Sequence, residues 1–538
     1  MKYDKKVFSI ISALLLIIFF TACSGDSTNS KGEVKEDNSN LNETGFPIVD
    51  EPIELTFFTG KSPDNRENFE EATIWKEYAE KTNVDVNFDL VPFESLGEKK
   101  NLVLASGDYP DAFYSARLSS SDLAKYGEQG SLIELNDLID DYAPNLKKLM
   151  EEDPNLRKGL SMPDGKIYSF PLYYDPEFIS SLIASPLWVN QEWLDKLDME
   201  EPETTEEFYN YLKAVKETDL TGDGKDDQIP FSGRNIWPLL NHLKGAWGLG
   251  TTGLFHRYID VDPETEELRF FRTDPKYKEV LEYTHKLYDE GLIDPEVFDI
   301  SVAELHSKGS EGILGSTIVP NPETSMNQEN YVGLGALKGP HGDQLYSHVQ
   351  SPLLHLGAFA ITDKNEHPEA TIRWIDHFYG EEGAKLYFMG VEGVTYEENS
   401  DGKLEYKDDI TDNPEGLTLL QALAEHITWL GGSHPGYGRE EYIVGDTELQ
   451  NTKDVKEKAE PYIMEEIWYN FNYTDEELKF KQSIGAEIEN YVAEHEAGFV
   501  VGKIPFSEWD NYVDELEKMG VDKYIETENE AYKRYKDQ

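Results

Sequence analysis

Three segments, IELTFF at Ile53–Phe58, VDVNFDL at Val84–Leu90 and DAFY at Asp111–Tyr114, decide the fold. The first two alternate apolar and polar residues over most of their length, as half-buried strands do, and the third predicts a shorter strand. Between them, Asn68–Thr82 and Glu94–Ser106 place apolar residues at helical spacing. Strand, helix, strand, helix and strand in this order predict a parallel α/β sheet.

The pattern changes further along the chain. Leu182–Ala184 and Leu187–Val189 are short strand-like segments, and Asn190–Leu197 has helical spacing. Thr204 predicts the start of a second helix, because Glu207 stands three residues later as a capping box requires.

Length and charge limit the possible functions. The chain has 538 residues, enough for roughly two to four domain-sized units. Its formal net charge is −57, so binding to nucleic acid or to anionic lipid is disfavoured. Cys23 is the only cysteine, so an intramolecular disulfide is impossible and packing must supply the stability.

The N-terminus predicts export and a membrane tether. Lysines at the start are followed by the apolar run Val7–Phe20, which is short for a membrane span and leads into small residues. Phe20–Gly25 resembles a bacterial lipobox, which implies a signal peptide over residues 1–22 and lipidation of Cys23. The polar stretch up to residue 49 then predicts a flexible tether over 23–49. The alternative is an ordinary secretory signal with an incidental cysteine.

Several segments in a fixed order resemble the extracellular solute-binding proteins of type 1, above all the large lipoproteins of Gram-positive bacteria. The fullest match is Leu187–Leu197 together with Pro202 and Thr204–Phe208. The others are Leu104–Asp111, Pro163–Tyr168, Gly390–Tyr396, Gly502–Trp509, Met519-Gly520 and Ala531–Tyr535. Together they extend the resemblance over residues 50–538.

The resemblance implies an α/β fold of the type II periplasmic-binding-protein kind, with two lobes, a hinge between them and an extra helical C-terminal region. It places an N-lobe at 50–180 that resumes at about 350–400, a C-lobe at 181–345, and a helical region at 401–538 that completes the C-lobe and the cleft. It also implies a monomer on the outer face of the cell membrane that delivers an oligosaccharide to the permease subunits of an ABC importer by closing its cleft.

A stretch of oxygen-bearing side chains predicts a structural calcium site in the C-lobe. Asp219, Thr221, Asp223 and Asp227 recur at the short spacing that wraps oxygens around one Ca²⁺ ion, and Lys225 would offer its backbone carbonyl. Pro230 stands where an EF-hand has its bidentate carboxylate. Related solute-binding proteins use the residue after the last Asp, which implies Gln228 as a ligand here. We expect a Kd on the order of 10⁻⁴–10⁻³ M. The alternative is a solvated Asp-Gly turn.

Aromatic and polar residues after strand-like segments are the candidates for a sugar site, because sugar rings need a flat aromatic face and charge-assisted hydrogen bonds. Trp237, Trp247 and Tyr173 are the first choices. The others are Tyr174, Asp175, Arg234, Asn235, Trp429 and Glu392. The alternative for each is a place in the core or on the surface.

Two other classes of protein compete with a solute-binding protein. A secreted glycan hydrolase would need a pair of carboxylates, and no spacing among the 106 acidic residues singles one out. No serine-hydrolase elbow, zinc-protease motif or phosphate-binding glycine loop is present in the sequence. A surface lipoprotein that binds peptides or a partner without transport is the third class. We therefore predict a binding protein without catalytic residues.

Overall fold

β1 (Ile53–Lys61) and β2 (Val84–Pro92) pair in parallel along their whole length, from Ile53 opposite Val84 to Lys61 opposite Pro92. They belong to a six-stranded sheet with the order β14-β4-β11-β3-β1-β2. The other strands are β3 (Ala112–Leu118), β4 (Phe170–Tyr174), β11 (Leu353–Ile361) and β14 (Gly436–Gly438). β11 runs antiparallel to both of its neighbours, and the other pairs are parallel. The predicted parallel α/β start of the chain is confirmed.

The computed structural model describes residues 40–63, 65–183, 185–222, 224–225, 227–443 and 449–537. The predicted signal peptide, Cys23 and the tether up to residue 39 lie outside the described residues. Leu41–Gln538 forms one unit, which is described here by itself. Within the described residues, no helix is long and apolar enough to cross a membrane.

The predicted tether extends too far toward the body of the protein. Ile48 and Val49 are buried, and the Ile48 amide donates to the carbonyl of Thr82. Arg373 binds the carbonyl of Gly45 at 2.7 Å. Apolar side chains at 48 and 49 give this segment enough burial to pack on the first sheet's helices, so a tether cannot continue to residue 49.

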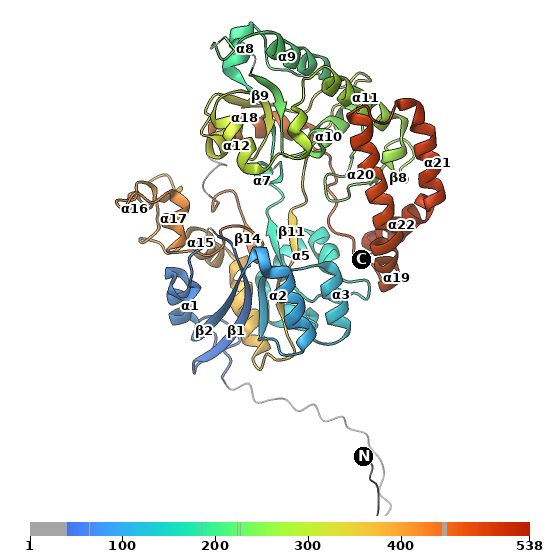
Figure 1. Cartoon of the computed structure of the whole chain (residues 1–538). Coiled ribbons are helices and arrows are strands. Elements are labelled where there is room, and N and C mark those ends of the chain that lie inside the picture. Colours follow the sequence, from blue (N-terminus) through green and yellow to red (C-terminus); the bar gives the residue numbers. More distant parts are fainter. Residues whose placement is uncertain are drawn as a thin grey trace, which may run out of the picture. The chain divides into compact units, whose positions relative to one another are not determined.

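A cluster of aromatic side chains fills one side of the first sheet, beneath α1 (Thr73–Thr82) and α14 (Pro368–Asp376). Phe57 from β1 meets Trp374 edge-on at 5.3 Å, and Trp75 stacks on Trp374 at 5.4 Å. This core joins α14, from the segment predicted to return near 350–400, to the N-terminal strands. It forms the first lobe (Figure 1).

A second sheet of four strands has the order β10-β5-β9-β6. Its strands are β5 (Leu187–Asn190), β6 (Ile229–Ser232), β9 (Leu314–Ile318) and β10 (Tyr331–Gly333). Its helices are α8 (Gln191–Leu197), α9 (Thr205–Glu217), α10 (Trp237–Lys244), α11 (Pro275–Asp289), α12 (Val302–Ser310) and α18 (Gln450–Ala459). This is the second lobe, and the predicted capping box of Thr204 and Glu207 at the start of α9 is confirmed.

Two details of the second half differ from the sequence prediction. Leu182 ends a short helix, α7 (Ile179–Leu182), where a strand-like segment was predicted. An apolar run this short fits a helix as well as a strand. The region 401–538 is shared between the lobes: β14 pairs with β4 in the first sheet, whereas α18 packs on β10 in the second.

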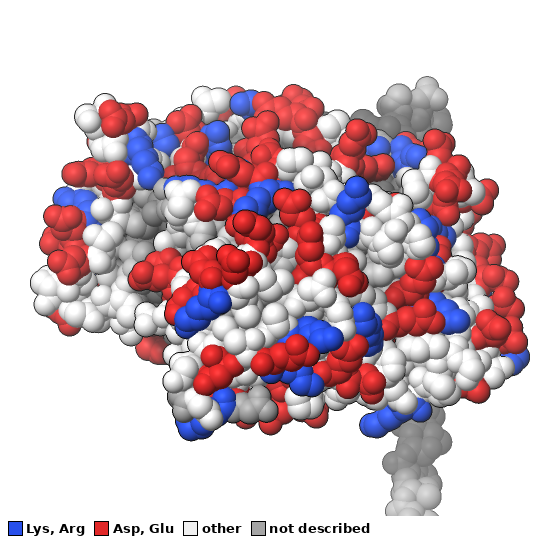
Figure 2. Space-filling model, turned by 90° about the horizontal axis from the view of Figure 1, so that it is seen from above, with Lys and Arg blue, Asp and Glu red and all other residues white. Residues whose placement is uncertain are grey.

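The C-terminal helices flank the second lobe. α20 (Ala486–Val500) packs along α11, and α21 (Trp509–Met519) and α22 (Val521–Asp537) follow it side by side (Figure 1). Figure 2 shows acidic side chains spread over one face of the molecule with basic ones among them, and no single acidic patch. The two-lobe α/β architecture with a helical C-terminal region is confirmed.

Candidate functional site

The connections between the two sheets identify one edge of each sheet as the place for a ligand. The chain crosses from β4 to β5 through residues 175–186 and returns from β10 to β11 through residues 334–352. These segments leave the first sheet at the edge where β1, β3 and β4 end. Ligands of open α/β sheets bind outside the carboxyl ends of the strands. This edge is therefore the first part of the candidate site.

A loop formed by residues 428–434 lies along that edge. The side-chain amide of Asn65 donates to the carbonyl of Thr428 at 3.1 Å. Gly431 adopts a φ of +86°, and a Cβ there would stand 2.2 Å from the Cβ of Ser62, so only glycine fits. The loop is thus fastened to the end of β1.

Arg117 near the end of β3 reaches the same loop. Its Nε donates to the hydroxyl of Ser433 at 2.7 Å, and its guanidinium lies 3.8 Å from the centre of the Phe93 ring. Burial lowers the pKa of Arg117, and no other cause opposes this shift. His355 approaches Ser433 at 3.4 Å, and burial lowers its pKa too.

The second lobe contributes the segment that follows β6. Arg234 and Asn235 are exposed directly after the strand, as the sequence predicts. The side-chain oxygen of Asn235 accepts the amide of Trp237 at 2.8 Å and so holds the first turn of α10. Trp237 is half-buried, and the guanidinium of Arg257 lies 4.6 Å from its ring centre. Trp237 and the Arg257 guanidinium therefore lie together at this strand end, and Arg234 is exposed three residues before Trp237 in the chain.

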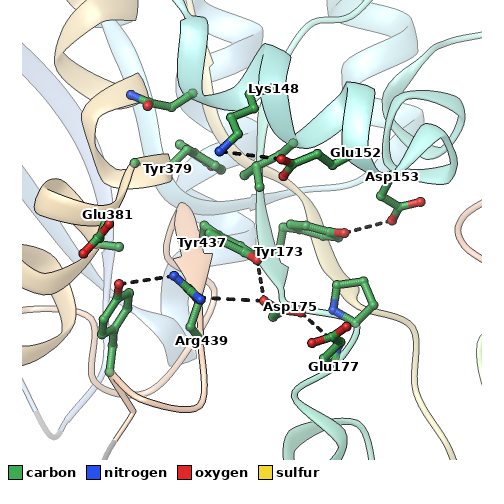
Figure 3. A pocket seen from close by; sticks show the side chains of 16 residues that line it. Lys148, Glu152, Asp153, Tyr173, Asp175, Glu177, Tyr379, Glu381, Tyr437 and Arg439 are labelled. Atoms are coloured by element: carbon green, nitrogen blue, oxygen red, sulfur yellow. Dashed lines mark hydrogen bonds and ion pairs between the residues drawn. The ribbon is translucent and has the colours of Figure 1, made fainter. Parts of the chain in front are cut away.

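Tyr173 and Asp175 lie beside a pocket of about 530 Å³ between β4, β14 and α5 (Pro144–Glu152) (Figure 3). Tyr173 is 1% exposed, and its ring stacks on that of Tyr437 at 5.6 Å. The hydroxyl of Tyr437 donates to Asp175 at 2.6 Å, and the Asp175 amide donates to the carbonyl of Gly438. Burial and this hydrogen bond raise the pKa of Tyr437. Asp175 thus fastens the segment 175–186, which crosses from β4 to β5, to β14.

Among the other predicted sugar residues, Trp247 is not at these strand ends, whereas Tyr174 is the last residue of β4 and Trp429 belongs to the loop at 428–434. Trp247 is 2% exposed, with its indole N–H on Glu279, so it is a core residue. Tyr174 is half-buried and its ring stacks on Phe178. Trp429 is half-buried, and its indole N–H donates to the Phe388 carbonyl at 3.0 Å.

Glu392 is exposed in the turn that connects α15 (Glu381–Met389) to β12 (Tyr396–Glu398). The pKa of Tyr396 is raised by burial first and by the Glu392 carboxylate second. This turn lies outside the strand-end segments described above, and the sequence prediction of a cleft role for Glu392 stays a prediction.

Asp219 shapes the predicted calcium loop. Its carboxylate accepts the amides of Gly222 at 2.7 Å and Gly224 at 3.0 Å, and the hydroxyl of Thr221 at 3.2 Å. The side chain of Lys225 is mostly exposed, and its ammonium lies 3.9 Å from the Asp227 carboxylate. The loop is therefore already curled around the Asp219 carboxylate.

Two oxygens of this loop fit a cation. Asp227 Oδ1 and Gln228 Oε1 are buried and have no hydrogen-bond partner among the residues that the structure describes. Buried acceptors without a partner are rare and need an explanation such as an ion. Asp223, the other predicted carboxylate ligand, lies outside the described residues. Among the residues that are described, no group of three or more His, Cys, Asp or Glu side chains has the arrangement of a metal site.

Sequence reasoning missed Arg117, Arg257 and Ser433. Arg117 follows the predicted strand Asp111–Tyr114 by three residues. A prediction that continued this strand to residue 118 would have placed Arg117 near the strand end. Ser433 approaches Arg117 across 316 positions of the chain, and no local pattern signals such a contact.

Comparisons with known proteins agree with this geometry. The family model of the bacterial extracellular solute-binding protein matches residues 65–385. The fructooligosaccharide ABC transporter substrate-binding protein FusA of Streptococcus pneumoniae is 30% identical over 98% of each chain. The polygalacturonan/rhamnogalacturonan-binding protein YtcQ of Bacillus subtilis is 25% identical over 86% of this chain and 88% of its own.

Two solved structures of S. pneumoniae FusA share the fold. The complex with kestose gives a TM-score of 0.73 at 27% identity and covers 90% of this chain and 99% of that one. The EF-hand mutant in complex with fructo-nystose gives a TM-score of 0.72 at the same identity and coverage. The family match extends over more than half of the sequence, and a relative 30% identical spans nearly all of it, so this chain belongs to the bacterial extracellular solute-binding protein family.

Proposed function

We propose that the protein binds an oligosaccharide at the strand ends of its two lobes and delivers it to an ABC importer. The observation that carries this proposal is the position of Trp237, with Arg257 over its face, in the segment that follows β6 and also contains the exposed Arg234. Aromatic faces and charge-assisted donors are the groups that hold sugar rings. The similarity to FusA, a fructooligosaccharide ABC transporter substrate-binding protein, supports this ligand class.

We further propose that lipidation of Cys23 fastens the protein to the outer face of the membrane as a monomer. Each buried CH₂ of a lipid chain stabilises attachment by about 0.8 kcal/mol, so two or three chains would hold it there. The tether keeps the loaded protein near the permease subunits and raises its local concentration. The relatives compared here are named as binding proteins, which favours transport over glycan hydrolysis.

Thermal unfolding of the purified protein with kestose, nystose and trigalacturonate tests the ligand class. A glycan present at about a hundred times its Kd should stabilise the native state by about 2.7 kcal/mol. The glycan should be recovered unchanged, and a cleaved glycan would favour a hydrolase. If no glycan raises the unfolding temperature, sugar import is rejected in favour of a peptide ligand or a partner-binding role.

Trp237→Ala should weaken binding of the glycan that stabilises the protein by about tenfold, equivalent to about 1.4 kcal/mol, because the ring loses its contact with the sugar. Isothermal titration calorimetry measures the change. Phe46→Ala is the matched control, since Phe46 is an aromatic side chain, 41% exposed, in the N-terminal segment away from the strand ends. Equal affinities for both variants would remove Trp237 from the site.

We also propose a structural Ca²⁺ in the loop at 219–228, held by Asp219, Asp223, Asp227 and Gln228, with Thr221 and the Lys225 carbonyl. The two buried oxygens of Asp227 and Gln228 without partners support it. The EF-hand named in the FusA mutant structure supports a calcium loop in a relative. When bound, the ion would neutralise the loop's carboxylates and fix its shape.

Removing calcium should therefore lower the unfolding temperature. At a Ca²⁺ concentration about a hundred times its Kd, the loss on adding a chelator should correspond to about 2.7 kcal/mol. Asp227→Asn should abolish this difference. Asp289→Asn, at the end of α11, should preserve it, because Asp289 lies outside the loop. An unmodified protein that unfolds at the same temperature with calcium and with chelator has no such site.

A further inference from the structure

Among the described residues, Arg117 has no anionic partner although the chain is strongly acidic. The sequence carries 106 Asp and Glu against 49 Lys and Arg. Five of the ten arginines form an ion pair with a carboxylate that the structure describes, namely Arg66, Arg269, Arg272, Arg439 and Arg534. Within the described part of the chain, no carboxylate lies within 4 Å of the Arg117 guanidinium. No described carboxylate therefore compensates the guanidinium charge, and the guanidinium is available to a ligand.

One contact holds the backbone of Arg117, and two hold its guanidinium. The ammonium of Lys100 donates to the backbone carbonyl of Arg117 at 2.9 Å and is fixed there by Asp122 at 2.8 Å. The Phe93 ring supports the guanidinium plane at 3.8 Å, and Ser433 accepts the Nε–H at 2.7 Å. Nη1 and Nη2 make no hydrogen bond to any described residue. The side chain thus presents two NH₂ groups, at Nη1 and Nη2, that no described residue engages.

The backbone around Arg117 is bent to expose this side chain. Arg117 has a φ of +52° and Ser115 a φ of +51°, values that residues other than glycine rarely adopt. β3 has three residues between Tyr114 and Leu118, where β11 has one between Gly357 and Phe359. This bulge leaves Arg117 exposed between two buried neighbours. Bulges and strained φ values of this kind gather at functional sites, where they aim a side chain.

We propose that Arg117 is the residue with which the first lobe selects its ligand. Its Nη1 and Nη2 form a planar fork that matches two neighbouring oxygen acceptors, either vicinal hydroxyls or a carboxylate of one sugar residue. The assignment rests on the proposed function, because it takes the ligand to be a glycan bound at the strand ends. Ser433 is a positioning residue that acts through Arg117.

The test compares Arg117→Lys with Arg157→Lys in the purified protein, with kestose and trigalacturonate as probes. Lysine keeps the positive charge and removes the fork, so the affinity for the bound glycan should fall about 10- to 100-fold, the loss expected for one or two charge-assisted hydrogen bonds. Arg157 is an exposed arginine without a carboxylate partner on α6 (Pro154–Leu160), and its substitution should leave the affinity unchanged.

A second variant separates positioning from folding. Ser433→Ala should weaken binding less than Arg117→Lys does, and the double variant should bind no more weakly than Arg117→Lys alone, because both changes act on one contact. The unfolding temperature without ligand should be similar for all variants. Additive losses would place Ser433 in a separate contact and contradict its positioning role.

Salt distinguishes the two kinds of acceptor. The affinity for trigalacturonate should fall as salt rises if a carboxylate occupies the fork, and the affinity for kestose should be nearly independent of salt if vicinal hydroxyls do. If the unmodified protein binds a glycan and Arg117→Lys binds it equally well, the assignment of Arg117 fails while the proposed function stands. If the unmodified protein binds no glycan, the proposed function fails and this assignment fails with it.

Discussion

Glu496→Gln should lower the free energy of unfolding by about 3–5 kcal/mol, because it leaves Arg272 as an unpaired buried charge. Arg272 is 1% exposed, and its Nη1 lies 2.6 Å from the Glu496 carboxylate. The hydroxyl of Tyr277 donates to the same carboxylate at 2.8 Å. Glutamine has the same shape but cannot compensate the guanidinium charge.

The pair joins two parts of the chain that are distant in sequence. Arg272 follows β8 (Leu268–Phe270) and also binds the carbonyl of Arg257, whose side chain covers Trp237. Glu496 lies on α20, in the C-terminal helical region. We therefore expect the substitution to loosen the attachment of α20 to the second lobe and, through Arg257, to weaken glycan binding.

Denaturant unfolding followed by tryptophan fluorescence measures the effect. Glu494→Gln is the matched control, since Glu494 is exposed on the same helix and makes no ion pair among the described residues. A loss below about 1 kcal/mol for Glu496→Gln, similar to that of an exposed ion pair, would show that the buried guanidinium is compensated in another way.

Acid should destabilise the protein between pH 6.5 and pH 4 through a pair of buried histidines. The ring of His242 on α10 stacks almost parallel on that of His348 at 4.2 Å, and His348 lies in the segment 334–352 that connects β10 to β11. Burial, with the Lys244 charge as a smaller cause, lowers the pKa of His242 to about 4. Burial also lowers the pKa of His348, and the neighbouring His242 and Lys244 lower it further.

The lowered pKa of His242 determines how the free energy of unfolding changes with pH. The folded state keeps His242 neutral, whereas the unfolded chain binds a proton at its ordinary pKa of about 6.5. Above pH 6.5 the neutral His242 costs the folded state nothing relative to the unfolded chain. As the pH falls from 6.5 to 4, the free energy of unfolding decreases progressively, and the loss is complete near pH 4. A difference of this size in pKa corresponds to about 3 kcal/mol for this histidine alone.

His348→Gln tests this assignment, because glutamine carries no charge at any pH. Denaturant midpoints between pH 7.5 and 4.5 should decline less steeply for this variant than for the unmodified protein. His367→Gln, at an exposed histidine before α14, should leave the decline unchanged. Parallel declines for His348→Gln and the unmodified protein would place the acid sensitivity elsewhere.

Local patterns predicted the features that depend on neighbours in sequence. The alternation in Val84–Leu90 marked β2, and Thr204 with Glu207 marked the start of α9. Residues 234–237 were placed correctly after a strand end, because a strand followed by polar residues and a helix start is visible within ten residues. The same patterns could not distinguish a core tryptophan such as Trp247 from a half-buried one such as Trp237, since both follow similar short motifs.

By itself, the sequence determined the family, the α/β class, the polar loop at 219–228 and the cysteine available for lipidation, because these depend on residue type and short spacing. Only the tertiary structure decided which side chains meet: Arg117 with Ser433, Arg272 with Glu496, and His242 with His348. Such contacts join segments from 100 to more than 300 positions apart. Their partners are selected by how the strands and helices pack together, and a local pattern contains no information about that packing.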